Sequence, residues 1–98
     1  MSLLDTFRPK WQNSNPDKRL EAIDELDAQD TLERIALSDE NNDVRAAAIR
    51  KLKQIPVLLQ ISKNDSEASI RRLSEARYFE EVAKMLKEFR EPANDEVK

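Results

Sequence analysis

The chain has 98 residues, of which 38% are charged and 5% aromatic, and its formal net charge is −3. It has no cysteine and no histidine, which excludes disulfides, thiol nucleophiles, histidine acid–base catalysis and ordinary zinc sites. Glycine, which tight β-hairpins need, is also absent, so the composition predicts an all-α fold. The longest apolar run, residues 55–59, is too short to cross a bilayer. We expect a cytoplasmic protein that uses no cofactor and does not enter the membrane.

The first residues are predicted to cover the N-terminal end of the fold. Ser2 and Asp5 have the spacing of a helix capping box, and Pro9 disfavours helix at the residue before it. We therefore expect a short helix before Pro9, followed by burial of the apolar side chains Leu3, Leu4, Phe7 and Trp11. Tryptophan is also common at the centre of protein interfaces, but the position of Trp11 beside Phe7 favours a covering role.

A 26-residue repeat organises the following part of the chain. An asparagine or aspartate recurs at this interval, and an arginine follows each by six residues: Asn13, Asp39 and Asp65, then Arg19, Arg45 and Arg71. A second pattern, which includes Leu32 and Leu58, advances by 26 residues and then by only 21, to Phe79. The third unit is therefore shortened, as terminal units of repeat arrays often are.

Each unit is predicted to form two short helices. Asn15 as N-cap and Pro16 at the first helical position begin one helix, and Asn41 or Asn42 begins its counterpart. We expect helices near residues 16–26, 28–37, 43–53 and 55–62. Residues 66–90 contain neither proline nor glycine, so they form either one fused helix or two. Residues 1–90 are expected to form one domain, and residues 91–98 a frayed polar tail.

The apolar positions of these helices predict the core. In residues 43–53, for example, Val44, Ala47, Ala48 and Leu52 fall on one helical face. The side chains expected to be mostly buried are Leu26, Leu32, Ile35, Ala48, Leu52, Leu58, Ile61, Phe79 and Val82.

The pattern Asp-x4-Val-Arg-x2-Ala-Ile-x2-Leu, from Asp39 to Leu52, resembles HEAT-like repeats. It is most similar to the short bacterial and archaeal kind found beside bilin-lyase-type proteins. The opening Lys10-Trp11-x3-Asn15-Pro16-x2-Arg19-Leu20-x-Ala22-Ile23 resembles the first unit of such arrays. The resemblance implies a short, right-handed α-solenoid of about three helix pairs, with a degenerate C-terminal unit, a binding face and no catalytic residues.

The resemblance also implies a role for the repeated acids and arginines. It pairs Asp39 with Arg45, and Asp65 with Arg71, across the turn between helices and in a stack from unit to unit. Asn13 stands where the first unit would have an acid, so its bond to Arg19 is expected to be weaker. We interpret these residues as a structural turn ladder, because loop backbone groups need hydrogen-bond partners.

Charge is segregated along the chain. Residues 17–33 carry a net charge of −5 and residues 45–72 a net charge of +5. Five cations are predicted to be exposed, several of them in one basic ridge on the long helices: Arg50, Lys51, Lys53, Arg71 and Arg72. The plainer interpretation is a solvated face on which neighbouring units attract each other. The functional interpretation is a surface that attracts an acidic partner.

These patterns favour a binding protein over an enzyme. No set of nucleophile, base and oxyanion donors can be assembled from the sequence, so we expect no catalysis. The leading hypothesis is a helical-repeat module for protein–protein interaction. The alternative is an accessory binder of nucleic acid or another polyanion through the basic ridge. Self-association, or a place at the end of a longer array, is a third hypothesis that an exposed apolar end face would support.

Overall fold

The computed structural model describes residues 7–96, and the side chains of residues 7–90. This part of the chain is helical, without a β-strand. A 3-10 helix, η2 (Lys10–Gln12), precedes five α-helices: α1 (Pro16–Glu25), α2 (Gln29–Ser38), α3 (Asn42–Lys51), α4 (Ile55–Asn64) and α5 (Ala68–Glu96). The predicted all-α class is therefore confirmed, and the four short helices agree with the expected ranges to within two residues.

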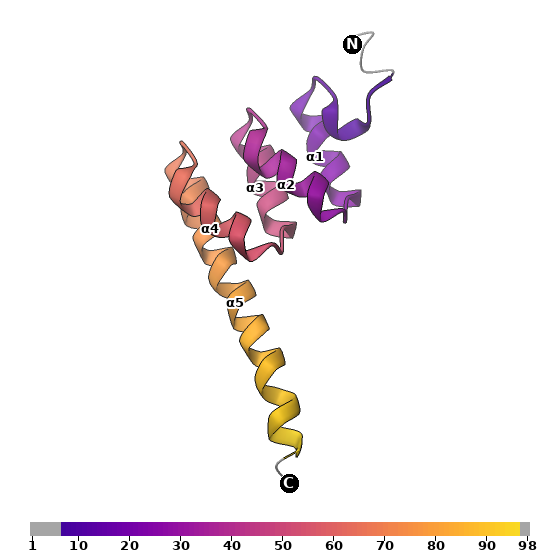
Figure 1. Ribbon diagram of the computed structural model, residues 1–98. Helices are drawn as coiled ribbons and strands as arrows, with labels where there is room; N and C mark the ends of the chain where they lie inside the picture. Colours follow the sequence, from indigo (N-terminus) through magenta and orange to yellow (C-terminus); the bar gives the residue numbers. More distant parts are fainter. Residues whose placement is uncertain (1–6, 97–98) are drawn as a thin grey trace.

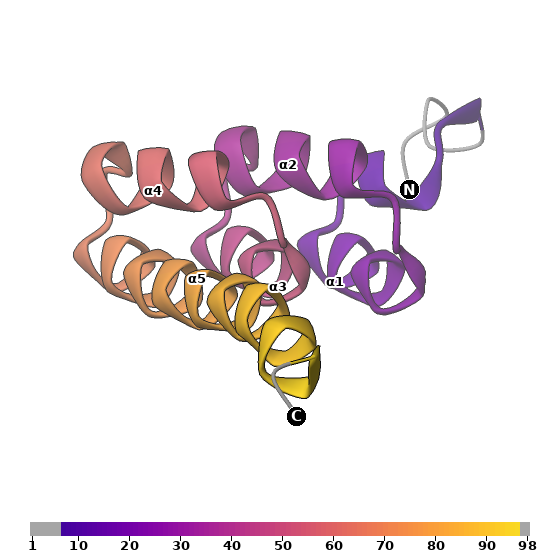
Figure 2. The ribbon, with the colours of Figure 1, turned by 60° about the horizontal axis from the view of Figure 1, so that its bottom comes forward.

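The α-helices lie in two layers. Helices α2 and α4 form one layer, and α1, α3 and α5 form the other (Figure 2). Residues 66–90 do not form two helices, because α5 starts at Ala68 and continues past them to Glu96. The expected frayed tail therefore begins within this helix. The C-terminal half of α5 extends away from the other helices, as Figure 1 shows.

Asparagine side chains set where α1 and α3 begin. The Oδ1 atom of Asn15 accepts a hydrogen bond of 2.9 Å from the backbone N–H of Asp17, and Pro16 occupies the first helical position. In the next unit the cap is Asn41 rather than Asn42, and its Oδ1 accepts from Asp43 and Val44 at 2.8 and 3.2 Å. Each cap satisfies N–H groups that the helix itself cannot pair.

A single core lies between the two layers. Six of the nine predicted core side chains are buried: Leu32, Ile35, Ala48, Leu52, Leu58 and Ile61. Leu26 and Val82 are only half-buried. The prediction for Phe79 is wrong, because this side chain is 61% exposed. Its repeat counterparts Leu32 and Leu58 lie on separate second helices, whereas Phe79 stays on the unbroken α5, on a side that no other helix covers.

The N-terminal cover is only partly as expected. The helix predicted before Pro9 falls mainly on residues 1–6, which lie outside the described residues together with Leu3 and Leu4. Phe7 is 82% exposed, so its predicted burial is wrong. Trp11, in η2, is half-buried and packs against the core. The guanidinium carbon of Arg34 lies 5.3 Å from the centre of its ring, which adds a cation–π contact.

Candidate interaction surfaces

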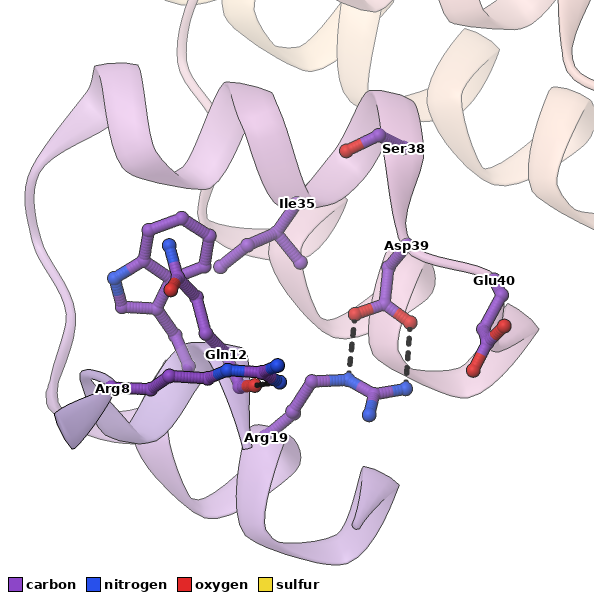
Figure 3. Close-up of a pocket in the computed structure, with 8 residues that line it drawn as sticks. Arg8, Gln12, Arg19, Ile35, Ser38, Asp39 and Glu40 are labelled. Carbon is purple, nitrogen blue, oxygen red and sulfur yellow. Dashed lines mark hydrogen bonds and ion pairs between the residues drawn. The ribbon is translucent and has the colours of Figure 1, made fainter. Parts of the chain in front are cut away.

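Two arginine–aspartate pairs join consecutive units. Arg19 donates to the Asp39 carboxylate through Nε at 2.8 Å and Nη2 at 3.1 Å (Figure 3), and Arg45 donates to Asp65 at 3.1 and 3.2 Å. All four side chains are less than 10% exposed. We call these two pairs the arginine ladder. Its forked, charge-assisted bonds fix the position of each unit on the next.

The ladder corrects the predicted pairing of residues six apart. Arg45 does not bond the Asp39 carboxylate; its Nη1 donates to the Asp39 backbone carbonyl at 2.8 Å. Arg71 bonds the Asp65 carbonyl in the same way. The Asp39 carboxylate bonds the Asn41 N–H as well as Arg19. Each aspartate therefore closes its own turn and also receives the arginine that precedes it by 20 residues.

The two ends of the ladder explain the sequence there. Asn13 accepts a hydrogen bond from the Asn15 N–H at 2.8 Å, which is the turn bond that Asp39 and Asp65 also make. An amide oxygen accepts this turn bond as well as a carboxylate oxygen does. At the other end, the ladder position that follows Arg71 is residue 91, a glutamate that lies 20 residues further along the same helix, α5.

A second set of cations caps the C-terminal ends of α1 and α3. Lys51 Nζ donates to the carbonyls of Ile23 and Asp24 at 2.9 and 3.2 Å. Arg77, which lies 26 residues later, donates to the Leu52 carbonyl at 2.7 Å and to the Ile49 carbonyl at 3.4 Å. Cations are favoured at these ends, where helix carbonyls lack partners. Sequence comparison could have found this set through its 26-residue spacing.

The basic ridge has a different composition from the one predicted. Arg50, Lys51 and Lys53 do come together, and they line a pocket of about 380 Å³ with Arg77 and Lys84 of α5. Arg71 and Arg72 do not line it. Lys51 and Arg71, expected to be exposed, are half-buried by their backbone bonds, whereas Arg50, Lys53 and Arg72 are exposed as predicted. We call the five-cation site the basic pocket; its other lining residues are Asp27, Gln29 and Leu32.

Glu81 holds two of the pocket's cations in place. Its carboxylate accepts from Arg77 at 2.9 Å and from Lys84 at 3.1 Å, and the side chain is 9% exposed. Burial alone would raise the pKa of Glu81, but the hydrogen bonds from Lys84 and Arg77 hold that pKa below its usual value. Arg50 and Lys53 have no such partner, since neither forms a side-chain bond within the described residues. Of the five cations in the basic pocket, Arg50 and Lys53 are therefore the most accessible to an anion.

A second cavity lies at the N-terminal end, also with a volume of about 380 Å³. It opens between the segment that contains Arg8, Trp11 and Gln12 and the end of α2, beside the Arg19–Asp39 pair (Figure 3). The two charged groups of that pair are already bonded to each other. Arg8, which donates to the Gln12 carbonyl, and Glu40 also line the cavity, so it presents charges of both signs beside Trp11.

The strongest surface feature is apolar and lies on α5. Seven large hydrophobic side chains are exposed among the described residues, and four of them are on this helix. Phe79 is 61%, Met85 41%, Leu86 51% and Phe89 78% exposed. With the half-buried Val82, we call Phe79, Leu86 and Phe89 the α5 row. The sequence pattern placed Phe79 and Val82 of this row in the core, whereas Phe79 is exposed and Val82 half-buried.

Two further features are absent from the residues that the structure describes. No group of three or more acidic side chains there is placed to hold a metal ion. No helix among them is long and apolar enough to cross a membrane. Family models, curated proteins and solved structures give no match to this chain.

Proposed function

We propose that this chain is a non-catalytic helical-repeat module that binds another protein chain through the exposed face of α5. The α5 row carries the proposal. Phe79 and Phe89 are large, apolar and more than half exposed, and such patches in water usually mark interfaces. Aromatic anchors of this kind contribute most of the energy in many interfaces.

The interpretation as a HEAT-like solenoid supports this proposal. The turn bonds, the arginine ladder and the helix-end cations each recur after 26 residues, as stacked units require. In such a stack the ladder and the core keep the units rigid. A rigid body would then hold α5 in one orientation for its partner.

The test compares two double variants in a pull-down from native lysate. Phe79→Ser with Phe89→Ser removes the apolar anchors, and Leu37→Ser with Leu59→Ser changes two exposed leucines on α2 and α4. We expect the first variant to lose the captured protein and the second to keep it, with helicity by circular dichroism unchanged in both. Equal capture by the α5 variant and the parent would show that the row is not the interface.

The basic pocket favours a second candidate function, the binding of nucleic acid or another polyanion. Five cations surround one concavity, and Arg50 and Lys53 have no internal partner there. Phosphate binding of this kind weakens steeply as salt rises, because each contact releases counterions.

The experiment titrates a fluorescent single-stranded oligonucleotide at two salt concentrations. Lys53→Glu should weaken binding at low salt and flatten the salt dependence. Lys63→Glu makes the same charge change on an exposed residue that does not line the basic pocket, and it should have little effect. Identical curves for the two variants would exclude the pocket as the binding site.

A further inference from the structure

We propose that the partner of α5 is a second copy of this chain, and that the two α5 helices pair antiparallel along the α5 row. This inference rests on the proposed function, since it assigns the occupant of the same surface. Phe79, Val82, Leu86 and Phe89 are spaced by three, four and three residues. That is the spacing of a heptad seam between two helices.

In one register, every residue of the α5 row faces a residue of the same row in the second copy. If residue 84 lies at the two-fold axis, Phe79 faces Phe89 of the second copy, and Val82 faces Leu86. Each large side chain then has an apolar partner, and the same contacts form twice, as a symmetric dimer requires. Met85 and half-buried Tyr78 lie seven residues apart, at the same edge of the row, and the two would extend the apolar contact there.

Charge selects the antiparallel orientation. In this register residues 78–81, with two acids and no base, lie opposite residues 87–90 of the second copy, with two bases and one acid. Antiparallel pairing lays the acidic half of one helix beside the basic half of the other, while parallel pairing would align like charges. The helix dipoles also oppose each other favourably in the antiparallel arrangement.

The shape of the molecule leaves room for this partner. Every described side chain from Ala83 to Arg90 is exposed, so a partner can reach this length of α5 without displacing a buried side chain. On the packed half, the outward residues Arg72, Glu75, Ala76 and Phe79 are exposed too. The end of the second copy's helix can therefore lie along this outer side of α5.

The first experiment measures mass by sedimentation over a range of protein concentrations. The parent should form a dimer, and Phe79→Ser with Phe89→Ser should raise the dimer Kd by about 100-fold or more, since aromatic anchors dominate such seams. Leu37→Ser with Leu59→Ser should leave the Kd unchanged. A parent that stays monomeric throughout overturns the dimer. If that monomer still captures another protein through α5, the proposed function stands without it.

The second experiment tests the orientation by oxidising single-cysteine variants, which is clean because the chain has no cysteine. In the antiparallel pair the two copies of residue 83 lie close together beside the axis. The two copies of residue 72 are then about 36 Å apart along the helices. We expect Ala83→Cys to form a disulfide-linked dimer and Arg72→Cys to remain monomeric on a denaturing gel. A disulfide at position 72 and none at position 83 would show parallel pairing and overturn the proposed orientation.

Discussion

The two halves of α5 belong to one helix but have different surroundings. In the first half, Ile70 and Ser74 are buried, and the Ser74 hydroxyl donates to the Leu58 carbonyl of α4 at 2.7 Å. In the second half, every described side chain from Ala83 to Arg90 is exposed. Helices in proteins are stabilised mainly by packing of an apolar face, and a single short helix is marginal in water. The second half therefore has an apolar face that is exposed rather than packed against another helix.

The largest expected effect separates a leucine of the core from a leucine of the α5 row. Leu52 is fully buried, so Leu52→Ala should lower the free energy of unfolding by about 2–5 kcal/mol through lost burial and a cavity. Leu86→Ala removes the same atoms from an exposed position. Chemical denaturation at a concentration that keeps the chain monomeric should show little change for Leu86→Ala. Equal losses in the two variants would mean that Leu86 is packed as well as Leu52.

A smaller effect should separate a buried carboxylate from an exposed one. Asp39→Asn keeps an oxygen for the turn bond, as Asn13 shows, but removes the charge that pairs with Arg19. Leaving that buried guanidinium without its partner should cost about 1–3 kcal/mol of unfolding free energy. Asp24→Asn is the control, because its side chain is exposed. The arginine ladder would be ruled out as a stabilising contact if both variants had the parent's denaturation midpoint.

The smallest expected effect is a pH dependence of stability that arises from Glu81, which lies where the packed half of α5 ends. The folded-state pKa of Glu81 is lowered from 4.5, so its stabilising contribution is present above that pH and is lost as the pH falls through the lower folded value. The free energy of unfolding should therefore decrease below about pH 4.5. Glu81→Gln should show a shallower decrease than the parent.

Glu21 is a useful comparison for this titration. Its pKa is also lowered, mainly by a hydrogen bond from Lys10 and by the charge of Lys18, but the group is exposed. Solvent screens exposed pairs, so Glu21→Gln should change the pH dependence less than Glu81→Gln. The reverse order would mean that the attachment of α5 to α3 does not depend on Glu81.

The sequence predicted the helices well because their signals are local. Asn15, Pro16 and Asn41 act on the turn in which they stand, and the apolar spacing of α2 and α4 needs no knowledge of neighbours. Phe79 was misplaced because its burial depended on a turn that the shortened unit does not make. A residue at the position equivalent to Leu32 and Leu58 is buried only if the chain before it turns back in the same way.

The choice of ladder partners could not be read from spacing. In a 26-residue repeat, an acid six residues before one arginine is also 20 residues after the previous arginine. Asp39 therefore fits Arg45 and Arg19 equally well in sequence, and only the packing of the units places its carboxylate on Arg19. The basic pocket was partly missed for a similar reason, because Arg77 and Lys84 reach it only through the crossing of α5 over the end of α3.

The 26-residue spacing of these bonds also determines how the molecule can be lengthened. Residues 39–64 contain one aspartate that receives an arginine, one arginine that reaches forward and one lysine that caps the helix before it. A second copy of this segment inserted after Asn64 would meet the same partners on both sides, so no existing bond would lose its counterpart. The inserted chain would gain one helix pair and one ladder pair, with α5 unchanged at its end. The distance between Trp11 and the α5 row could thus be increased in steps of one unit, as with a modular spacer.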